Sequence, residues 1–258
     1  MQLTGRILRV DDVSSERRDE MFDLMSRHFE FVRRAEFDDD LSEKDWVIEM
    51  TDRATNVLCG FSTQMVFDFD TRGRTVKALF SGDTIVDPMC WHRNPLAGLW
   101  GRLVLWIIDQ HPRTELYWIL ISKGYKTYRF LPTFFHEFFP RYDVATPCRA
   151  DDVLNAFGRN RHPAAYDSMA GVIRAGAQSC RLRSGLAEVT PTRLRDPHVR
   201  FFHQRNPHHM SGDELCCLAP LTRENFTRAA HKVIDTAPDQ FPDFEAAGKV
   251  SATHLLQP

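Results

Sequence analysis

The chain has 258 residues, of which 43% are hydrophobic and 26% charged, a composition typical of a globular protein that buries a sizeable core. Its formal net charge of -2 argues against nucleic acid as the main partner, because neutralising phosphates requires a basic excess. The six cysteines form no C-x-x-C pair, so we expect reduced, mostly buried thiols. The first residues lack the pattern of a signal peptide, and the most apolar stretch, Leu96 to Ile108, is too short to span a bilayer. We therefore expect a cytoplasmic protein without a membrane span.

The first part of the chain has the pattern of a strand, a helix and then a meander. Ile7 to Val10 predicts a short strand, and Ser14 predicts the N-cap of a helix with Arg17 and Arg18 on its wet side. The acidic run Glu36 to Asp40 indicates a loop. Three strands with short connections, typical of an antiparallel meander, are predicted at Trp46 to Met50, Val57 to Asp68 and Val76 to Val86.

A strand, buried helix and strand unit occupies the centre of the chain, from about Val76 to Ser122. Asn94-Pro95 predicts a helix start, with Asn94 as the N-cap. Leu96 to Gln110 is apolar almost all round, so we expect this helix to be buried on several sides. Leu116 to Ser122 is a continuous apolar run, typical of a strand covered on both faces. The length of the crossover predicts that this strand is parallel to the one before the helix.

The rest of the chain gives weaker patterns. Residues 123–140 are helical in composition but broken at Pro132. Residues 149–196 are interpreted as a helical insertion or lid within a single domain, 1–258, and residues 238–258 as a C-terminal tail. Two further strands and a final helix capped by Thr222 are predicted at Val199 to Gln204, Glu214 to Ala219 and Thr222 to Ile234.

The order of these elements resembles the GNAT superfamily of N-acyltransferases. The residues that carry the resemblance are ALFSGDTIVDP at 78–88, the helix from Asn94, the strand LYWILIS and the following KGYKTYRFL. The resemblance implies an α/β (α+β) fold with a mixed, mostly antiparallel central sheet and flanking helices. It also implies that the fourth strand bulges and splays from the fifth, and that the acyl thioester lies in the resulting V with its carbonyl on backbone N–H groups of the bulge. Gly82, in mid-strand, is what such a bulge needs, and the donors would act as an oxyanion hole.

The stretch HRNPLAGLWG, before and within the central helix, departs from the family. GNAT proteins usually carry [QR]-x-x-G-x-[GA] there, with backbone amides that hold the pyrophosphate of CoA. Arg93 and Gly98 are present, but the spacing differs and Pro95 removes an N–H donor. Either the cofactor is held differently or the donor is an acyl carrier protein, as in some relatives of the fold. We therefore expect acyl-CoA or acyl carrier protein as acyl donor, and no permanently bound cofactor.

Five residues are candidates for acid–base chemistry. Asp83 follows the expected bulge and could take a proton from an attacking ammonium, or simply hydrogen-bond the backbone at a strand distortion. Glu49 is a second candidate base, with a solvent-facing strand carboxylate as the alternative. His92 is a candidate acid or base, or an ordinary loop histidine. Tyr125 and Tyr128 occupy the segment where GNAT enzymes often place a tyrosine that protonates the departing thiolate, and for either one simple packing is the alternative.

Other residues are candidates for binding the donor and the substrate. The donor-binding candidates are Ser81, Gly82, Thr84, Arg93, Lys123 and Lys126. The lysines recur with Arg129 every three residues, a pattern that also fits a solvated helix face. The pocket candidates are Phe80, Phe134, Phe135, His136 and Glu137, because polar residues among phenylalanines must find partners or face a cavity. A partly exposed amphipathic helix is the alternative for the last pair. The histidines of the second half lack a metal-ligand spacing, so no metal site is expected.

Two functions stay open at this point. One is an acyltransferase that moves an acyl group from a thioester to a small-molecule amine by direct attack in a ternary complex, with acyl carrier protein as a candidate partner. The other is a catalytically silent GNAT-like domain that binds an apolar ligand or a protein partner through its aromatic segment; the departure from the phosphate loop keeps it open. A homodimer is not excluded by either.

Overall fold

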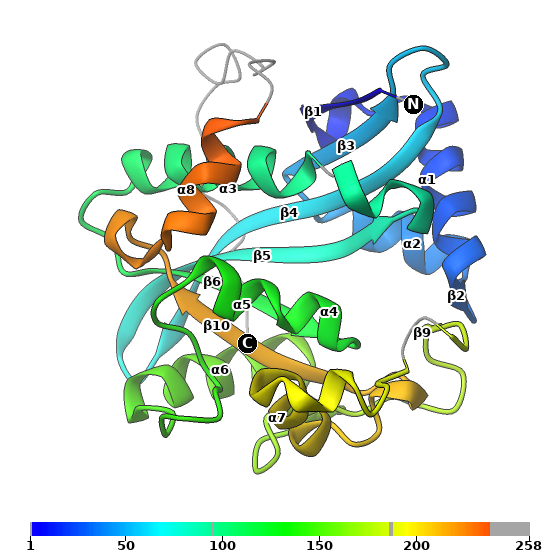
Figure 1. Ribbon diagram of the computed structural model, residues 1–258. Helices are drawn as coiled ribbons and strands as arrows, with labels where there is room; N and C mark the ends of the chain where they lie inside the picture. The colour runs from blue at the N-terminus through cyan, green and yellow to red at the C-terminus, as the bar shows by residue number, and fades with distance from the viewer. Residues whose placement is uncertain (1, 94, 186–187, 238–258) are drawn as a thin grey trace.

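The computed structural model describes residues 2–93, 95–185 and 188–237, with His92 and Arg93 described as backbone only. Its centre is an eight-stranded sheet in the order β1-β3-β4-β5-β6-β10-β8-β7, with helices against both faces (Figure 1). Most pairs of neighbouring strands are antiparallel, and β5 with β6 is a parallel pair. The expected mixed, mostly antiparallel sheet is confirmed. Among the described residues, no helix combines the length and the apolar character that crossing a bilayer requires.

The N-terminal part follows the predicted order. β1 (Leu3–Arg9) leads into α1 (Ser15–His28), and the hydroxyl of Ser14 accepts a hydrogen bond from the backbone N–H of Arg17, which confirms the predicted N-cap. The meander consists of β3 (Trp46–Asp52), β4 (Leu58–Thr71) and β5 (Arg74–Val86), as predicted.

The acidic run predicted as a loop is instead part of α2 (Arg34–Ser42). Phe37 and Leu41 lie four residues apart, so they share one face of the helix, and both are buried in a core that also contains residues of α1. The acidic side chains between them point outward, and Asp38 forms an ion pair with Arg34 one turn earlier. The charges masked the apolar pair that determines the structure of this segment.

The central unit has the predicted crossover. α3 (Leu96–Gln110) begins where expected, although Pro95 is its capping residue and Asn94 lies outside the described residues. β6 (Leu116–Ser122) is parallel to β5, as predicted. α3 packs between the sheet and α8 (Arg228–Asp235).

The second half of the chain extends this core. α4 (Tyr125–Tyr128) and α5 (Phe130–Phe134) are short, and the first turn of α5 tolerates Pro132 because a proline there lacks only an N–H without an intrahelical partner. α6 (Cys148–Arg161) packs on one sheet face, while β7 (Tyr166–Asp167) and β8 (Val172–Ile173) extend the sheet beyond β10. β9 (Arg181–Leu182) pairs with β2 (Phe29–Glu30). The segment 149–196 therefore contributes to the main sheet and its core.

Two predictions in the C-terminal part need correction. Residues 199–204 belong to a helix, α7 (Pro197–Arg205), in which Asp196 caps the N-terminus and Val199 and Phe202, three residues apart, are buried. β10 (Glu214–Pro220) is confirmed. The final helix is shorter than predicted, because Thr227 and not Thr222 caps α8, after a 3-10 turn at Arg223–Asn225. The predicted C-terminal tail, 238–258, lies outside the described residues.

Candidate active site

The sheet is distorted at the middle of β5. Gly82 and Asp83 stand opposite the single residue Thr63, because the pairing of β4 with β5 changes register there. The pairing of β5 with β6 ends at Ser81, although β6 continues to Ser122. The two parallel strands therefore separate where the bulge begins, which confirms the distortion predicted at Gly82.

The bulge requires glycine at position 82. A Cβ atom there would lie 2.6 Å from Oγ1 of Thr63 and 2.8 Å from Cε of Lys44. Both neighbours are buried, and the ammonium of Lys44 lies 2.7 Å from the carboxylate of Asp40. A side chain larger than that of glycine would therefore displace at least one of these two groups.

A cavity of about 410 Å³ lies where the strands separate. We call one part of it the aromatic end, formed by Trp100 of α3, Trp118 of β6, and Phe130 and Phe134 of α5. The charged end is formed by Asp83, Lys123 and Glu214, whose charges act on one another, and His28, beside Asp87, also lines the cavity. Trp118 and Lys123 are five residues apart along β6 and the residue that follows it, which is roughly 16 Å in an extended strand. The cavity thus runs past the bulge from an aromatic to a charged environment.

A chain of hydrogen bonds fixes the polar wall of the cavity next to the bulge. The indole N–H of Trp118 donates to Oγ of Ser81 over 2.9 Å, and this hydroxyl donates to Oε1 of Gln64 over 2.6 Å. The amide of Gln64 donates to Oγ of Ser62 over 2.7 Å, and Ser62 shares a 2.7 Å hydrogen bond with Thr84. Ser81 and Thr84, both candidates from the sequence, therefore lie on either side of the bulge with fixed hydroxyl positions.

Asp83 lies half-buried at the charged end. Burial raises the pKa of its carboxyl to about 6, and the nearby carboxylate of Asp40 adds to this effect. The ammonium groups of Lys123 and Lys44 act in the opposite direction. A carboxylate with a pKa of about 6 is ionised at neutral pH and is a stronger base than an ordinary aspartate, which suits general-base chemistry.

Lys123 and Glu214 form an ion pair beside Asp83, with 3.4 Å between Nζ and Oε1. Burial opposes the charge of Lys123, but the surrounding negative groups, with the carboxylates of Glu214 and Asp83 among them, together hold the pKa of the lysine above its ordinary value. Glu214 was not a candidate from the sequence. The antiparallel register of β10 on β6, in which Leu215 pairs with Ser122, places it next to Lys123, and no local pattern indicates that pairing.

The two candidate tyrosines have different surroundings. Tyr125 lines the cavity. The ring of Tyr128 is fully buried against Phe202, outside the described lining, and its hydroxyl donates a 2.8 Å hydrogen bond to the carbonyl oxygen of Pro140. Burial raises the pKa of Tyr128 well above its ordinary value. Tyr128 is therefore a packing residue, which was the alternative to a catalytic role. Tyr125 is the candidate tyrosine that lines the cavity.

The three basic residues that follow β6, Lys123, Lys126 and Arg129, also have different surroundings. Lys123 and Lys126 line the cavity, and the ammonium of Lys126 lies 3.9 Å from the ring centroid of Trp91, another lining residue. Arg129 forms a 3.2 Å ion pair with Asp196 of the cap of α7 and is outside the described lining. His92 and Arg93 are in the 3-10 helix Pro88–Arg93, and their side chains lie outside the described part of the chain.

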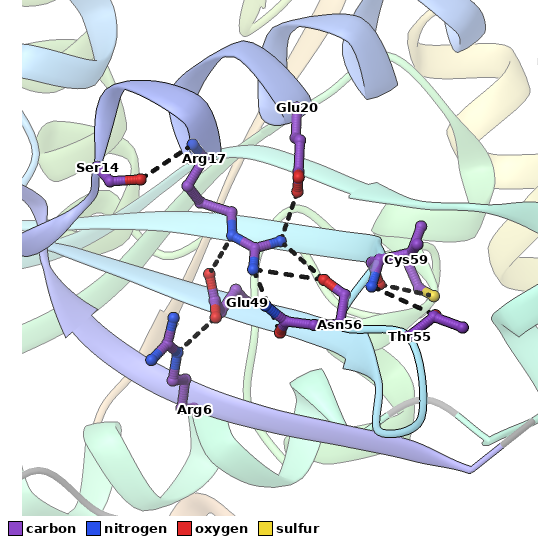
Figure 2. Close-up of polar contacts among 9 residues, drawn as sticks. Arg6, Ser14, Arg17, Glu20, Glu49, Thr55, Asn56 and Cys59 are labelled. Atoms are coloured by element: carbon purple, nitrogen blue, oxygen red, sulfur yellow. Dashed lines mark hydrogen bonds and ion pairs between the residues drawn. The ribbon is translucent and has the colours of Figure 1, made fainter.

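Glu49 is held away from the cavity, between the sheet and α1 (Figure 2). Its carboxylate is buried, 2.5 Å from Nε of Arg6 and 3.4 Å from Nε of Arg17, so it is not the solvent-facing carboxylate of the alternative reading. Arg17, predicted on the wet side of α1, is buried as well, because its guanidinium also binds Glu20 and the backbone carbonyl of Asn56. Glu49 is thus part of a structural network that fastens α1 to the sheet.

Of the five predicted pocket residues, Phe134 lines the cavity. The other four are not among the described residues that line it. Phe80 packs against Phe157 on the α6 side of the sheet, and Phe135 packs in the core between Trp118 and Phe226. His136 and Glu137 are exposed in an extended segment, not on a helix, and their backbone N–H groups donate to the backbone carbonyl and the side-chain oxygen of Asn225. Their place among phenylalanines therefore does not bring their side chains into the cavity.

The glycines after Asn94 have a packing role. A Cβ atom at Gly98 would lie 2.7 Å from the carbonyl oxygen of Val233, and one at Gly101 would lie 2.4 Å from Cγ1 of Ile234. Both glycines therefore let α8 approach α3 closely. The part of the pyrophosphate motif that the sequence retains at Gly98 is explained by this contact between helices.

Comparison with known proteins gives distant similarities in structure. No family model matches the chain, and no curated protein matches its sequence. A probable N-acyltransferase from Enterococcus faecalis is 12% identical with a TM-score of 0.41, over 84% of this chain and 64% of that one. Yeast N-myristoyltransferase with bound myristoyl-CoA is 9% identical with a TM-score of 0.36, over 46% of this chain and 31% of that one. A GNAT family N-acetyltransferase from Escherichia coli in complex with CoA is 16% identical with a TM-score of 0.37, over 50% and 69%. The matches thus take in less than two thirds of the first two proteins.

Proposed function

We propose that this chain is an N-acyltransferase that moves an acyl group from a thioester donor to an amine acceptor by direct attack. The observation that carries the proposal is the cavity at the separation of two parallel strands, with Gly82 in a bulge on its wall and Asp83 at its charged end. A bulge leaves backbone groups outside the regular ladder, and such groups are suitable donors to a carbonyl oxygen that gains charge during attack.

The reaction requires two proton movements, and the cavity offers a group for each. The amine nitrogen forms a bond to the carbonyl carbon of the thioester, and the carboxylate of Asp83 accepts the proton that the nitrogen must lose. Collapse of the tetrahedral adduct breaks the carbon–sulfur bond, and the hydroxyl of Tyr125 protonates the departing thiolate. The aromatic end takes the apolar part of the acyl group, since its lining is aromatic and aliphatic.

The donor is a thioester of CoA or of an acyl carrier protein. Both present the same thioester chemistry, and they differ in the phosphates and protein surface that follow. Gly98 and Gly101 pack against α8. They therefore have a packing role here, in place of the phosphate-binding role that glycines have in a pyrophosphate loop. Lys126, exposed at the edge of the cavity, is the cation placed to meet an anionic part of either donor.

The test is release of free thiol from acyl-CoA and from acyl carrier protein loaded with the same acyl groups, each with a panel of amines. We expect amine-dependent release with at least one donor, and the preferred donor identifies the carrier. Asp83→Asn should lower kcat by about 10²–10⁴-fold, the usual contribution of a general base. Asp109→Asn is the matched control, because it removes an exposed carboxylate whose partner, Arg223, is also exposed. A ligand that binds without any thiol release would instead support the silent binding domain.

A further inference from the structure

The aromatic end of the cavity lies over the part of the sheet where β5 and β6 are still paired. Trp118 pairs with Leu79 there, two positions before Leu120 pairs with Ser81 at the start of the bulge. The indole of Trp118 is held beside the bulge by its hydrogen bond to Ser81, and this residue is only 6% exposed. Phe135, which packs against it, is 2% exposed. The aromatic end is therefore the inner part of the cavity.

Another part of the cavity opens to the surface. Trp91 lines the cavity and is 43% exposed. Lys126, whose ammonium lies over the ring of Trp91, lines it too and is also exposed. We call this part the mouth. The mouth is where a ligand can extend a bulky, polar part into the solvent.

Trp100 and Phe134 border two cavities. Besides the main cavity, they line a second one of about 10 Å³ at the contact between α3 and α8. A cavity of this size holds at most about one water molecule. The two aromatic side chains therefore separate the aromatic end from a space that lies behind them, against α8.

The aromatic end presents an apolar surface to a ligand. The hydroxyl of Ser81 and the indole N–H of Trp118 are both used in hydrogen bonds within the wall. Nε1 of Trp100 is itself buried, so this ring presents carbon atoms to the cavity. Polar groups of a ligand would lose water there without gaining a partner, whereas apolar groups gain from leaving water.

The main cavity is larger than the transfer of a two-carbon acyl group requires. At roughly 30 Å³ for each non-hydrogen atom, the share of a water molecule in the liquid, its volume of about 410 Å³ admits about a dozen such atoms. The carbons and oxygen of an acetyl group, the sulfur and the attacking nitrogen take less than half of that space. The remainder is available to a longer acyl chain.

We propose that the aromatic end takes an apolar acyl group of about six to eight carbons, and that Trp100 sets the upper limit of its length. The inference rests on the proposed function and names the class of its donor. The carrier of the thioester occupies the mouth, the carbonyl lies at Gly82, and the acyl chain runs inward past Trp118 toward Trp100. Each methylene group that leaves water for this surface adds binding energy, which an acetyl group cannot supply.

The experiment measures binding of alkyl thioethers of pantetheine, the arm that CoA and acyl carrier protein share, because a thioether cannot transfer its chain. Ethyl, butyl, hexyl, octyl and dodecyl thioethers are titrated into the whole protein in a calorimeter. We expect the affinity to rise about fourfold for each added methylene group, and to stop rising between octyl and dodecyl. An ethyl thioether that binds as tightly as the hexyl thioether, or no binding by any of the series, would overturn the inference.

Substitutions of Trp100 test the upper limit itself. Trp100→Leu and Trp100→Ala shorten the side chain in two steps and open the aromatic end toward the small cavity at α8. The chain length at which the affinity stops rising should increase by about two carbons or more at each step. Because this length is a comparison among ligands on one protein, a partial loss of stability does not imitate a shift. Trp100→Leu keeps an apolar side chain in the wall and decides the question alone where the alanine variant does not fold.

Trp106→Leu is the matched control. Trp106 belongs to the same helix, packs against Trp46 and is not among the described residues that line the cavity. This variant should keep the length limit of the unmodified protein. A limit that stays the same in the Trp100 variants, or that shifts equally in the control, would contradict the role of Trp100.

Thiol release separates this inference from the proposed function. Length-dependent binding without release of thiol from any acyl donor would overturn the acyltransferase proposal and leave the apolar pocket in place. Release from acetyl donors as fast as from hexanoyl and octanoyl donors, at concentrations below saturation, would support the transfer reaction and overturn the inference.

Discussion

Replacing Gly82 with alanine is the most direct perturbation of the bulge. The added methyl group would lie 2.6 Å from Oγ1 of Thr63 and 2.8 Å from Cε of Lys44, whereas real Cβ atoms essentially never have contacts under 3.0 Å. One side of each contact must therefore move by roughly 0.5–1 Å to reach an ordinary van der Waals distance. Thr63 is 1% exposed and Lys44 is anchored to Asp40, so we expect the backbone of the bulge to give way.

The magnitude follows from these contacts. Inserting a methyl group into a close-packed site costs about 1–3 kcal/mol of the free energy of unfolding. Displacing a backbone donor from a carbonyl oxygen lowers kcat by about 10²–10³-fold in enzymes that use such donors. Gly82→Ala should therefore lower kcat by about 10²–10³-fold, or roughly 2.7–4 kcal/mol, on top of the smaller loss of stability.

The assay pairs denaturant unfolding with initial rates of thiol release. Gly176→Ala is the matched control: the atom nearest to its Cβ position is Oγ of Ser179, at an ordinary distance of 3.5 Å. We expect this control to change stability by less than about 0.5 kcal/mol. Thr63→Ala in the Gly82→Ala background removes one of the two close contacts and should restore part of the lost stability. A Gly82→Ala protein with unchanged kcat would refute the role of the bulge in catalysis.

The remaining predictions concern three other sites. Glu49→Gln should lower the free energy of unfolding by about 1–3 kcal/mol, because the buried guanidinium of Arg17 then keeps only Glu20 as its counter-charge, while kcat per folded molecule stays the same; a fully stable but inactive variant would return Glu49 to the catalytic machinery. Activity should fall as the pH drops through about 6, where Asp83 becomes protonated. In a pH–rate profile, Asp40→Asn should move this limb to lower pH and Lys44→Met to higher pH, since the first removes a negative and the second a positive charge near Asp83; shifts in the same direction would contradict the electrostatic account. Tyr128→Phe should cost about 1–3 kcal/mol in thermal unfolding through the lost buried hydrogen bond, with turnover unchanged, and a large loss of turnover would make it a catalytic tyrosine after all.

The sequence was sufficient for the elements whose patterns are local and continuous. The meander, the all-round apolar α3 and the apolar β6 have one dominant pattern each, so their structures follow from it. Gly82 could be predicted because a glycine inside a strand has few other uses. α2 and α7 were missed because charged and aromatic residues hid apolar pairs three or four positions apart, which are the signal of a half-buried helix.

The candidate site was predictable only in part, for a related reason. Asp83 is the neighbour of Gly82 in the chain, and Lys123 and Tyr125 directly follow β6, the parallel strand that pairs with β5. Glu214 and His28 reach the cavity through strand pairing and the end of α1, which no local pattern specifies. Glu49 shows the opposite case, since two arginines distant from it in sequence turned a candidate base into the centre of a buried network.

The pairing of β2 with β9 has a consequence for how the site is assembled. The bulge and the aromatic end are encoded almost entirely between β4 and α5, whereas three other lining residues, His28, Leu182 and Glu214, come from distant parts of the chain. The wall around the bulge therefore depends on strands that follow one another in the chain, whereas the rest of the lining depends on contacts between residues far apart in sequence.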